Sequence, residues 1–199
     1  MLKKLSLILA VLSFLSLGAA AWAAEMNFSA DIETESQGRV VTSKMYLNGL
    51  KSRMEMGGAE QSGITIARGD KRLAWVLMPA QKMYMEIAYK PNMTTRVNDP
   101  KVQVERKFIK NDKVDGHPTK NYHITTVIDG KKQSSYVWEA TDLKNMVVKY
   151  QSEDKKTTTT WKNIKMGGGS DGSLYELPEG YKKVTMPGMG DMGGMKHEK

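Results

Sequence analysis

Residues 41–56 read Val-Thr-Ser-Lys-Met-Tyr-Leu-Asn-Gly-Leu-Lys-Ser-Arg-Met-Glu-Met, and this stretch decides the fold. Apolar or small side chains alternate with polar ones on both sides of the central Asn48-Gly49 pair. Alternation with period two is typical of a half-buried strand, and Asn-Gly between two such segments is the strongest short signal for a tight hairpin. The side chains that share a face before and after the turn are Val41, Ser43, Met45 and Leu47, then Leu50, Ser52, Met54 and Met56.

The same pattern continues outward from this hairpin. Alternating segments lie at 28–33, 64–66, 73–77, 83–87, 102–109, 122–128, 134–138, 146–150 and 157–164, and turn residues such as Gln37-Gly38 and Asp129-Gly130 separate them. Short strands with frequent turn signals indicate a meander. The run Thr157–Thr160 is β-branched yet polar, which suits an exposed or edge strand. We therefore predict a mainly β fold, an incomplete and strongly bent antiparallel β-barrel of about eleven strands with few short helices.

The N-terminus has the layout of a secretory signal peptide. Lys3 and Lys4 precede an apolar run, and Ala21-Trp22-Ala23 offers a cleavage site with small residues at the required spacing. The apolar run is short for a membrane span, which needs about 20 residues; an uncleaved anchor is the alternative. We predict a signal peptide over 1–23, a single β domain over 24–186, and a periplasmic location.

Composition excludes several classes of function. The chain of 199 residues carries a net charge of +8, and its basic residues are scattered among acidic ones, whereas nucleic-acid binding needs clustered positive charge. Cysteine is absent, which excludes disulfides, thiol catalysis and a lipidated cysteine. No nucleophile elbow, phosphate loop or dinucleotide fingerprint occurs. His117 and His123 lack a third strong metal ligand. We predict neither an enzyme nor a cofactor.

Two features suggest binding. The first is an apolar face on the segments between residues 45 and 87, where flexible methionines can adapt to acyl chains of different shape; the alternative is a filled core. The predicted cavity residues are Met45, Leu47, Met54, Met56, Ile64, Ile66, Trp75, Leu77, Met83 and Met85.

The second feature is the glycine-rich tail over 187–199, whose composition predicts disorder. Methionines recur there every third residue, and soft thioethers select Cu(I). The candidate ligands are Met186, Met189, Met192, Met195 and His197. A low-complexity tail without function is the alternative.

Several motifs resemble known exported proteins. The segments 69–84, Gly-Asp-Lys-Arg-Leu-Ala-Trp-Val-Leu-Met-Pro-Ala-Gln-Lys-Met-Tyr, and 45–55, Met-Tyr-Leu-Asn-Gly-Leu-Lys-Ser-Arg-Met-Glu, are similar to strands of the periplasmic lipoprotein-sorting carriers, LolA-like and LolB-like. Leu-Tyr-Glu-Leu-Pro-Glu-Gly-Tyr at 174–181 and Val-Asp-Gly-His-Pro-Thr-Lys at 114–120 resemble a closer family of uncharacterised exported bacterial proteins with that fold. The resemblance covers roughly residues 28–186.

The resemblance implies an open barrel with an apolar cavity lidded by short helices, and transport of lipid or acylated protein. It makes Arg53 a candidate polar contact for cargo, although Arg53 alternates with Met54. One difference is that the carriers begin with a helix, whereas here the mature chain leads almost directly into Phe28.

These observations support two hypotheses of different class. The first is a soluble periplasmic protein that binds an apolar or acyl ligand, lipid or lipoprotein, in the half-barrel cavity and delivers it towards the outer membrane. It would have transient membrane contact and an envelope membrane protein as partner. The alternative is an envelope scaffold or stress protein with Cu(I) capture by the tail.

Overall fold

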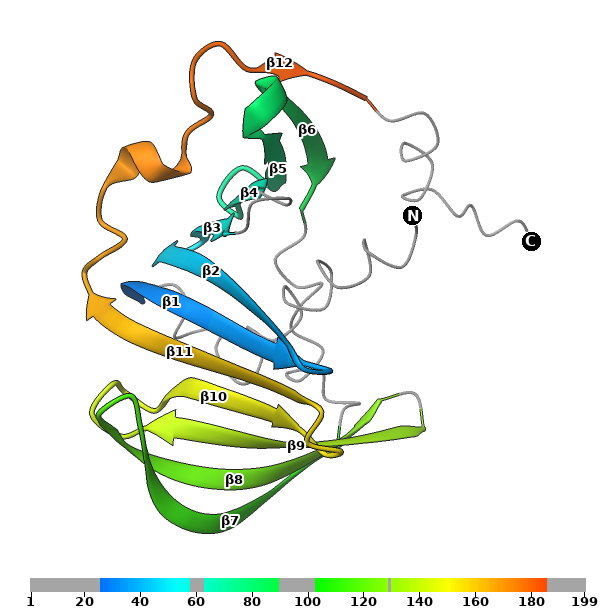
Figure 1. Ribbon diagram of the computed structural model, residues 1–199, viewed down its shortest axis with the longest axis vertical. Coiled ribbons are helices and arrows are strands. Elements are labelled where there is room, and N and C mark those ends of the chain that lie inside the picture. Colours follow the sequence, from blue (N-terminus) through cyan, green and yellow to red (C-terminus); the bar gives the residue numbers. More distant parts are fainter. Residues whose placement is uncertain (1–25, 58–62, 90–102, 129, 186–199) are drawn as a thin grey trace.

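The computed structural model describes residues 26–57, 63–89, 103–128 and 130–185. They form a bent, open sheet of twelve strands in the order β12-β6-β5-β4-β3-β2-β1-β11-β10-β9-β8-β7 (Figure 1). The strands are β1 (Asn27–Ser36), β2 (Arg39–Asn48), β3 (Lys51–Met56), β4 (Gly63–Arg68), β5 (Leu73–Met78), β6 (Met83–Ala88), β7 (Gln103–Val114), β8 (His117–Ile128), β9 (Lys131–Ala140), β10 (Met146–Ser152), β11 (Thr157–Met166) and β12 (Lys182–Lys183).

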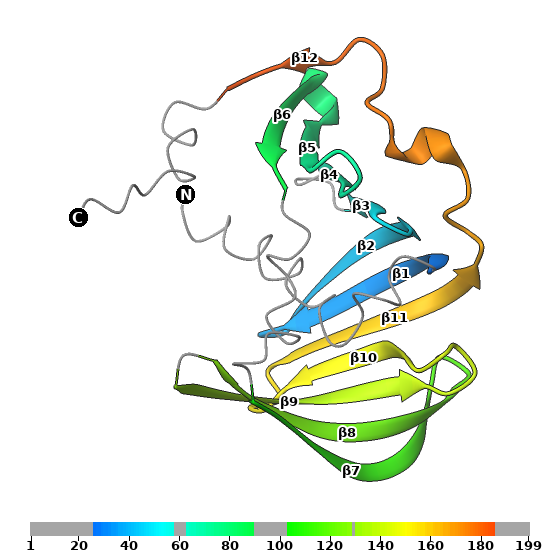
Figure 2. The ribbon, with the colours of Figure 1, turned by 180° about the vertical axis from the view of Figure 1, so that it is seen from behind.

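The predicted fold class is confirmed. The strands β1 to β11 correspond to the alternating segments of the sequence and are antiparallel to their neighbours, while β12 pairs in parallel with β6 and was not predicted. Helix in the described residues is limited to the 3-10 turns η2 (Pro79–Gln81) and η5 (Gly172–Tyr175). The sheet does not close, because β12 and β7 lie at opposite ends of it in both ribbon views (Figures 1 and 2).

The hairpins follow from their turn residues. Gln37 and Gly38 both take positive φ, 51° and 74°, as a type I′ turn requires. In the hairpin between β2 and β3, Asn48 pairs with Lys51, so the two-residue loop is Gly49-Leu50. Gly49 is the first central residue of this turn and has a φ of 57°, a backbone conformation that glycine adopts without strain. The Asn-Gly signal was right about the hairpin and one residue off in its loop.

One long-range pairing joins two meanders, β1–β6 and β7–β11, into a single sheet. Strand β1 pairs with β11 from Phe28–Met166 to Ser36–Thr157, with an irregularity in register between Ser29 and Asp31. The threonine-rich strand β11 is thus central, and the prediction of an exposed or edge strand was wrong. Three of its hydroxyls have partners on neighbouring strands: Thr157 lies 3.0 Å from Ser36, Thr159 lies 3.0 Å from Thr34, and Thr158 accepts from Gln151 at 3.1 Å.

Three apolar clusters hold the sheet together. The central one lies where β1, β2 and β11 meet and contains Phe28, Ala30, Ile32, Met45, Leu47 and Trp161. A second contains Ile66, Trp75, Leu77 and Tyr175 on β4, β5 and η5. The third contains Val114, Trp138, Ala140 and Val148. A single-layer sheet buries these side chains through its bend and through the segment after β11.

Candidate ligand-binding face

The strand register places all six methionines of β2–β6 on one face of the sheet. Met45 lies opposite Met54, Met54 opposite Thr65, Thr65 opposite Val76, and Val76 opposite Met85. Residues directly opposite each other in a sheet point to the same side. We call this side the methionine face and define it by Met45, Met54, Met56, Met78, Met83 and Met85. Leu47, from the same predicted set, also lies on it.

The remaining predicted cavity residues lie on the other face. Ile64 is opposite Glu55 and Leu77, and Ile66 is opposite Arg53 and Trp75. The prediction from sequence grouped Ile64, Ile66, Trp75 and Leu77 with the methionines, and that grouping was wrong. The alternation within each strand was predicted correctly. The pairing of β3 with β4, however, places Thr65 opposite Met54, and Ile64 and Ile66 point to the other side. We call this second side the strap face.

A C-terminal strap covers the strap face. We define the strap as residues 167–183, the chain that leaves β11, passes through η5 and ends in β12 (Figure 1). Tyr175 of η5 is 0% exposed and packs with Ile66, Trp75 and Leu77. Its hydroxyl donates to the carbonyl of Gly169 at 2.9 Å, and burial raises the pKa of Tyr175 to about 12.

The glycines at the start of the strap permit its close approach to the sheet. A Cβ added to Gly169 would lie 2.2 Å from the carbonyl oxygen of Leu47, and one added to Gly168 would lie 2.2 Å from the hydroxyl of Ser29. Gly169 N–H also donates to the Asn27 side chain at 2.9 Å. The sequence alone does not reveal this close approach, because the atoms that exclude a side chain belong to distant strands.

Two arginines tie the strap to the sheet. Arg68 is 4% exposed, forms a bidentate pair with Asp70 at 2.9 and 2.8 Å, and donates to the carbonyl of Tyr175 at 3.1 Å and to Glu176. The Arg68 guanidinium lowers the pKa of Asp70 to about 2. Arg68 was not predicted as a site residue. The sequence did hold a signal, because Arg68 follows Ile64 and Ile66 at the same spacing of two, and a cation on an apolar face indicates a buried partner.

Arg53 lies on the strap face, away from the methionines. Its Nε donates to Glu55 at 2.6 Å and its Nη1 donates to the carbonyl of Leu174 at 3.1 Å. The suggestion that Arg53 contacts cargo on the methionine face is therefore not supported by its position. Its contacts hold the strap.

The far end of the strap protects the β6 edge of the sheet. Lys182 and Lys183 pair with Met83 and Tyr84, and Lys183 Nζ lies 2.7 Å from Glu86. Glu86 also accepts from the Trp75 indole at 3.0 Å. The Lys183 ammonium and the indole both lower the pKa of Glu86, so this carboxylate joins β5, β6 and β12.

The two faces of β3–β6 differ in the exposure of their large apolar side chains, although Ile64, Leu73 and Tyr84 on the strap face are also partly exposed. On the strap face, Ile66 and Leu77 are 0% exposed. On the methionine face, Met45 is buried, whereas Met54, Met56, Met78, Met83 and Met85 are all partly exposed.

One pocket of about 260 Å³ lies on the strap-face side of β1, β2 and β11. Its lining is largely polar and unsuited to an acyl chain: Ser29, Ala30, Asp31, Lys44, Tyr46, Asn163 and Lys165.

The histidines pair with carboxylates at the surface. His117 lies 2.8 Å from Asp142 and His123 lies 2.7 Å from Glu153. The described residues contain no group of three or more His, Cys, Asp or Glu side chains that would hold a metal ion. The suggested copper ligands between Met186 and His197 lie outside the described residues, as does the predicted signal peptide.

A single, almost entirely antiparallel sheet that does not close, with its own C-terminal strap over one face of β3–β5, defines the structural class. Within it, the chain belongs to a family described as a domain of unknown function, DUF4412, whose model matches residues 25–175. This confirms the sequence-based assignment to an uncharacterised family. No curated protein matches the chain. Among the described residues, no helix is long and apolar enough to cross a membrane.

Several solved structures are similar in fold at low sequence identity. An uncharacterised conserved protein from Thermus thermophilus has a TM-score of 0.56 at 10% identity, covering 81% of this chain and 91% of that one. A chain in the complex structure of Pseudomonas aeruginosa MucA/MucB has a TM-score of 0.56 at 11% identity, covering 82% of this chain and 60% of its own length. The Mycobacterium tuberculosis lipoprotein LppX has a TM-score of 0.46 at 13% identity, covering 70% and 87%.

Proposed function

We propose that this protein binds an apolar or acyl ligand, lipid or the acyl chains of a lipoprotein, on its methionine face. The observation that carries the proposal is the contrast between the two sides of β2–β6. Both sides are apolar, but the strap covers only one, and five of the six methionines on the other, all except the buried Met45, stay partly exposed. Exposed apolar patches on soluble proteins mark binding surfaces.

The chemistry of the face suits a flexible hydrocarbon chain. Methionine side chains are unbranched and polarizable, and they adapt to irregular apolar surfaces. They lie on β2, β3, β5 and β6, with Thr65 and Val76 between them in one cross-strand row. Few polar groups interrupt this surface, which agrees with ligand sites that are mostly apolar.

The N-terminal sequence supports a location in the periplasm, with cleavage after Ala23. There the protein would carry its ligand through water between membranes, with transient contact at each. The MucA/MucB structure contains two proteins in complex, and by analogy the carrier has a protein partner in the envelope. Binding and release of an apolar ligand need no catalytic group, in keeping with a role other than that of an enzyme.

A displacement experiment tests the proposal. An environment-sensitive fatty acid probe is titrated into the purified full-length protein and then displaced with phospholipid. Met54→Lys is expected to weaken probe binding at least tenfold, because an ammonium group in an apolar site is left uncompensated. Met54→Leu, which keeps the volume and polarity, should bind almost as the wild type does.

Val40→Lys is the matched charge control. Val40 is 59% exposed and lies on β2, on the side of the sheet opposite to Met45. This variant should fold and bind normally. If the wild type takes up no probe, or if Val40→Lys and Met54→Lys weaken binding equally, the proposal is wrong.

A further inference from the structure

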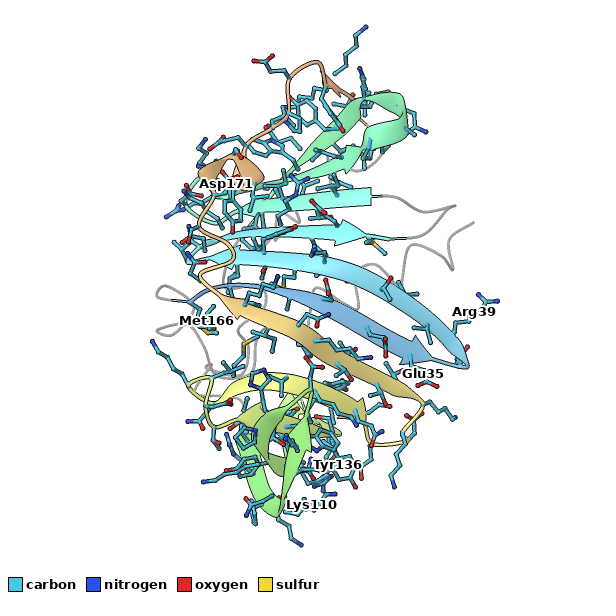
Figure 3. All side chains as sticks on the ribbon, turned by 60° about the vertical axis from the view of Figure 1, so that its left-hand side comes forward. Glu35, Arg39, Lys110, Tyr136, Met166 and Asp171 are labelled. Carbon is cyan, nitrogen blue, oxygen red and sulfur yellow. The ribbon has the colours of Figure 1, made fainter. Side chains whose placement is uncertain are left out.

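The two edges of the sheet are finished in different ways. The β6 edge is covered by β12 from the strap. The opposite edge is β7, a strand of 12 residues that has β8 as its only neighbour among the described strands. An edge strand presents a row of backbone N–H and C=O groups that can pair with another chain. Figure 3 shows Lys110 of β7 at the far end of the molecule from Asp171 of the strap.

The edge strand β7 carries exposed large apolar side chains among its charged ones. Val104, Phe108 and Ile109 are 44%, 50% and 44% exposed, and they are among the most exposed large apolar side chains in the described chain. Phe108 packs edge-to-face on Tyr122 with ring centroids 5.8 Å apart. The Arg106 guanidinium lies 3.7 Å from the centre of the same ring. The edge therefore has an ordered aromatic platform beside its unpaired backbone.

The charge of this strand is positive. It contains Arg106, Lys107, Lys110 and Lys113 against Glu105 and Asp112. Arg106 is paired with Glu139, and Lys110 with Asp112. Lys107 and Lys113 form no ion pair within the described residues. Both are exposed and free to meet an acidic partner.

A second copy of this chain meets like charges at the edge in one strand register. Lys107 lies opposite His123 and Lys110 opposite Asn121, two residues apart on β8, so both lysines point to the same side. An antiparallel pair of β7 strands that set Phe108 of one copy opposite Ile109 of the other would bring Lys107 of one copy opposite Lys110 of the other. Like charges directly opposite each other destabilise strand pairing.

We propose that β7 accepts an extended, acidic segment of another protein as an additional strand of the sheet. In this mode, backbone hydrogen bonds supply affinity and alternate side chains supply specificity. Carboxylates of the partner would lie beside Lys107, and its apolar side chains beside Phe108. The lysines and the interrupted register discourage other strands from pairing, which makes the edge selective. This surface is separate from the methionine face, so the proposal does not depend on the ligand.

Peptide titration tests the proposal on the full-length protein. The probe is a fluorescent, capped Thr-Glu-Val-Glu-Val-Glu-Val-Thr peptide, followed by anisotropy. Two control peptides accompany it, one with lysine in place of every glutamate and one with proline in place of the central valine, because proline removes the N–H that a strand needs. Backbone amide exchange is measured in parallel. The acidic peptide is expected to bind and to slow exchange in β7, and the control peptides are not.

Lys107→Glu should weaken binding of the acidic peptide roughly tenfold, about 1.4 kcal/mol. Lys120→Glu is the matched control, since Lys120 is also exposed but lies on β8, which has neighbours on both sides; it should bind within about twofold of the wild type. Equal binding of the proline peptide, equal effects of the two variants, or no binding would overturn the proposal. So would protection of β7 without peptide that rises with protein concentration, because a second copy would then occupy the edge.

Discussion

The strap face and the methionine face belong to the same strands, yet only one of them is completed by the described chain. On the strap face, Tyr175 fills the space over Ile66 and Leu77, and Arg53 and Arg68 donate to backbone carbonyls of η5. Those contacts specify one arrangement. On the methionine face, flexible side chains remain partly exposed. The specific contacts are therefore concentrated on one side of a single layer, and the other side keeps flexible side chains at its surface.

The largest effect should come from the residue that fills the strap face. Tyr175→Ala is expected to lower the free energy of unfolding by about 4 kcal/mol, because it empties a fully buried aromatic site. Urea denaturation followed by tryptophan fluorescence measures this. Tyr175→Phe, which loses only the hydrogen bond to Gly169, should cost about 1 kcal/mol. A loss below about 1 kcal/mol for the alanine variant would show that the strap contributes little to the fold.

A smaller effect should follow from lifting the strap at its start. Gly169→Ala places a methyl group against the Leu47 carbonyl oxygen, and the resulting backbone shift should cost about 2 kcal/mol. Gly172→Ala is the control on the same segment, since a Cβ there meets nothing within 4 Å. Thermal unfolding of the two variants should differ clearly. Equal melting temperatures would mean that the strap does not lie on β2 as described.

A change on the methionine face should cost less. Met85→Ala removes a partly exposed side chain, and we expect a loss of about 1 kcal/mol in the same urea experiment. A loss as large as that of Tyr175→Ala would mean that the methionine face is a packed core, and the ligand proposal would lose its basis.

The smallest effect should be the change in folding stability at acidic pH. The pKa of Asp70 is about 2 in the folded protein, below its usual 3.8, so the folded state binds this proton less readily than the unfolded state does. The stability that Asp70 contributes is complete above about pH 4 and is lost as the pH falls towards about 2. Asp70→Asn should therefore be less stable at about pH 7 and show a shallower loss of stability over this range. A wild-type slope in the variant would contradict the role of the Arg68–Asp70 pair.

Local patterns predicted the strands well because alternation and turn residues are properties of neighbouring residues. Gly38 and Gly130 mark their turns correctly, and the strands begin and end close to the predicted positions. The register between β3 and β4 could not be predicted from local alternation, because it depends on the connection between Gly57 and Gly63. A shift of one residue there exchanges the two faces, and that is how Ile64 and Ile66 came to be grouped with Met54.

The strap was missed for a different reason. Gly168 and Gly169 look like a flexible loop, and their function as close contacts becomes visible only when Ser29 and Leu47 are beside them. Thr159 was misjudged similarly, since a threonine-rich strand looks exposed until Thr34 is placed opposite it. Polar residues that satisfy one another across a sheet do not reveal burial in a linear pattern.

The pairing of β1 with β11 sets the order in which this protein is completed during synthesis. Six strands, β1 to β6, emerge first from the ribosome, with β1 open on one side and β6 open on the other. The partner of β1 is β11 and the partner of β6 is β12, and both come from the last part of the domain, between Thr157 and Lys183. A nascent chain therefore carries two unpaired strand edges until translation is nearly finished. During that time the unpaired edges favour aggregation, and chaperones act on such incomplete chains. A premature stop codon before Thr157 would leave both edges open at once.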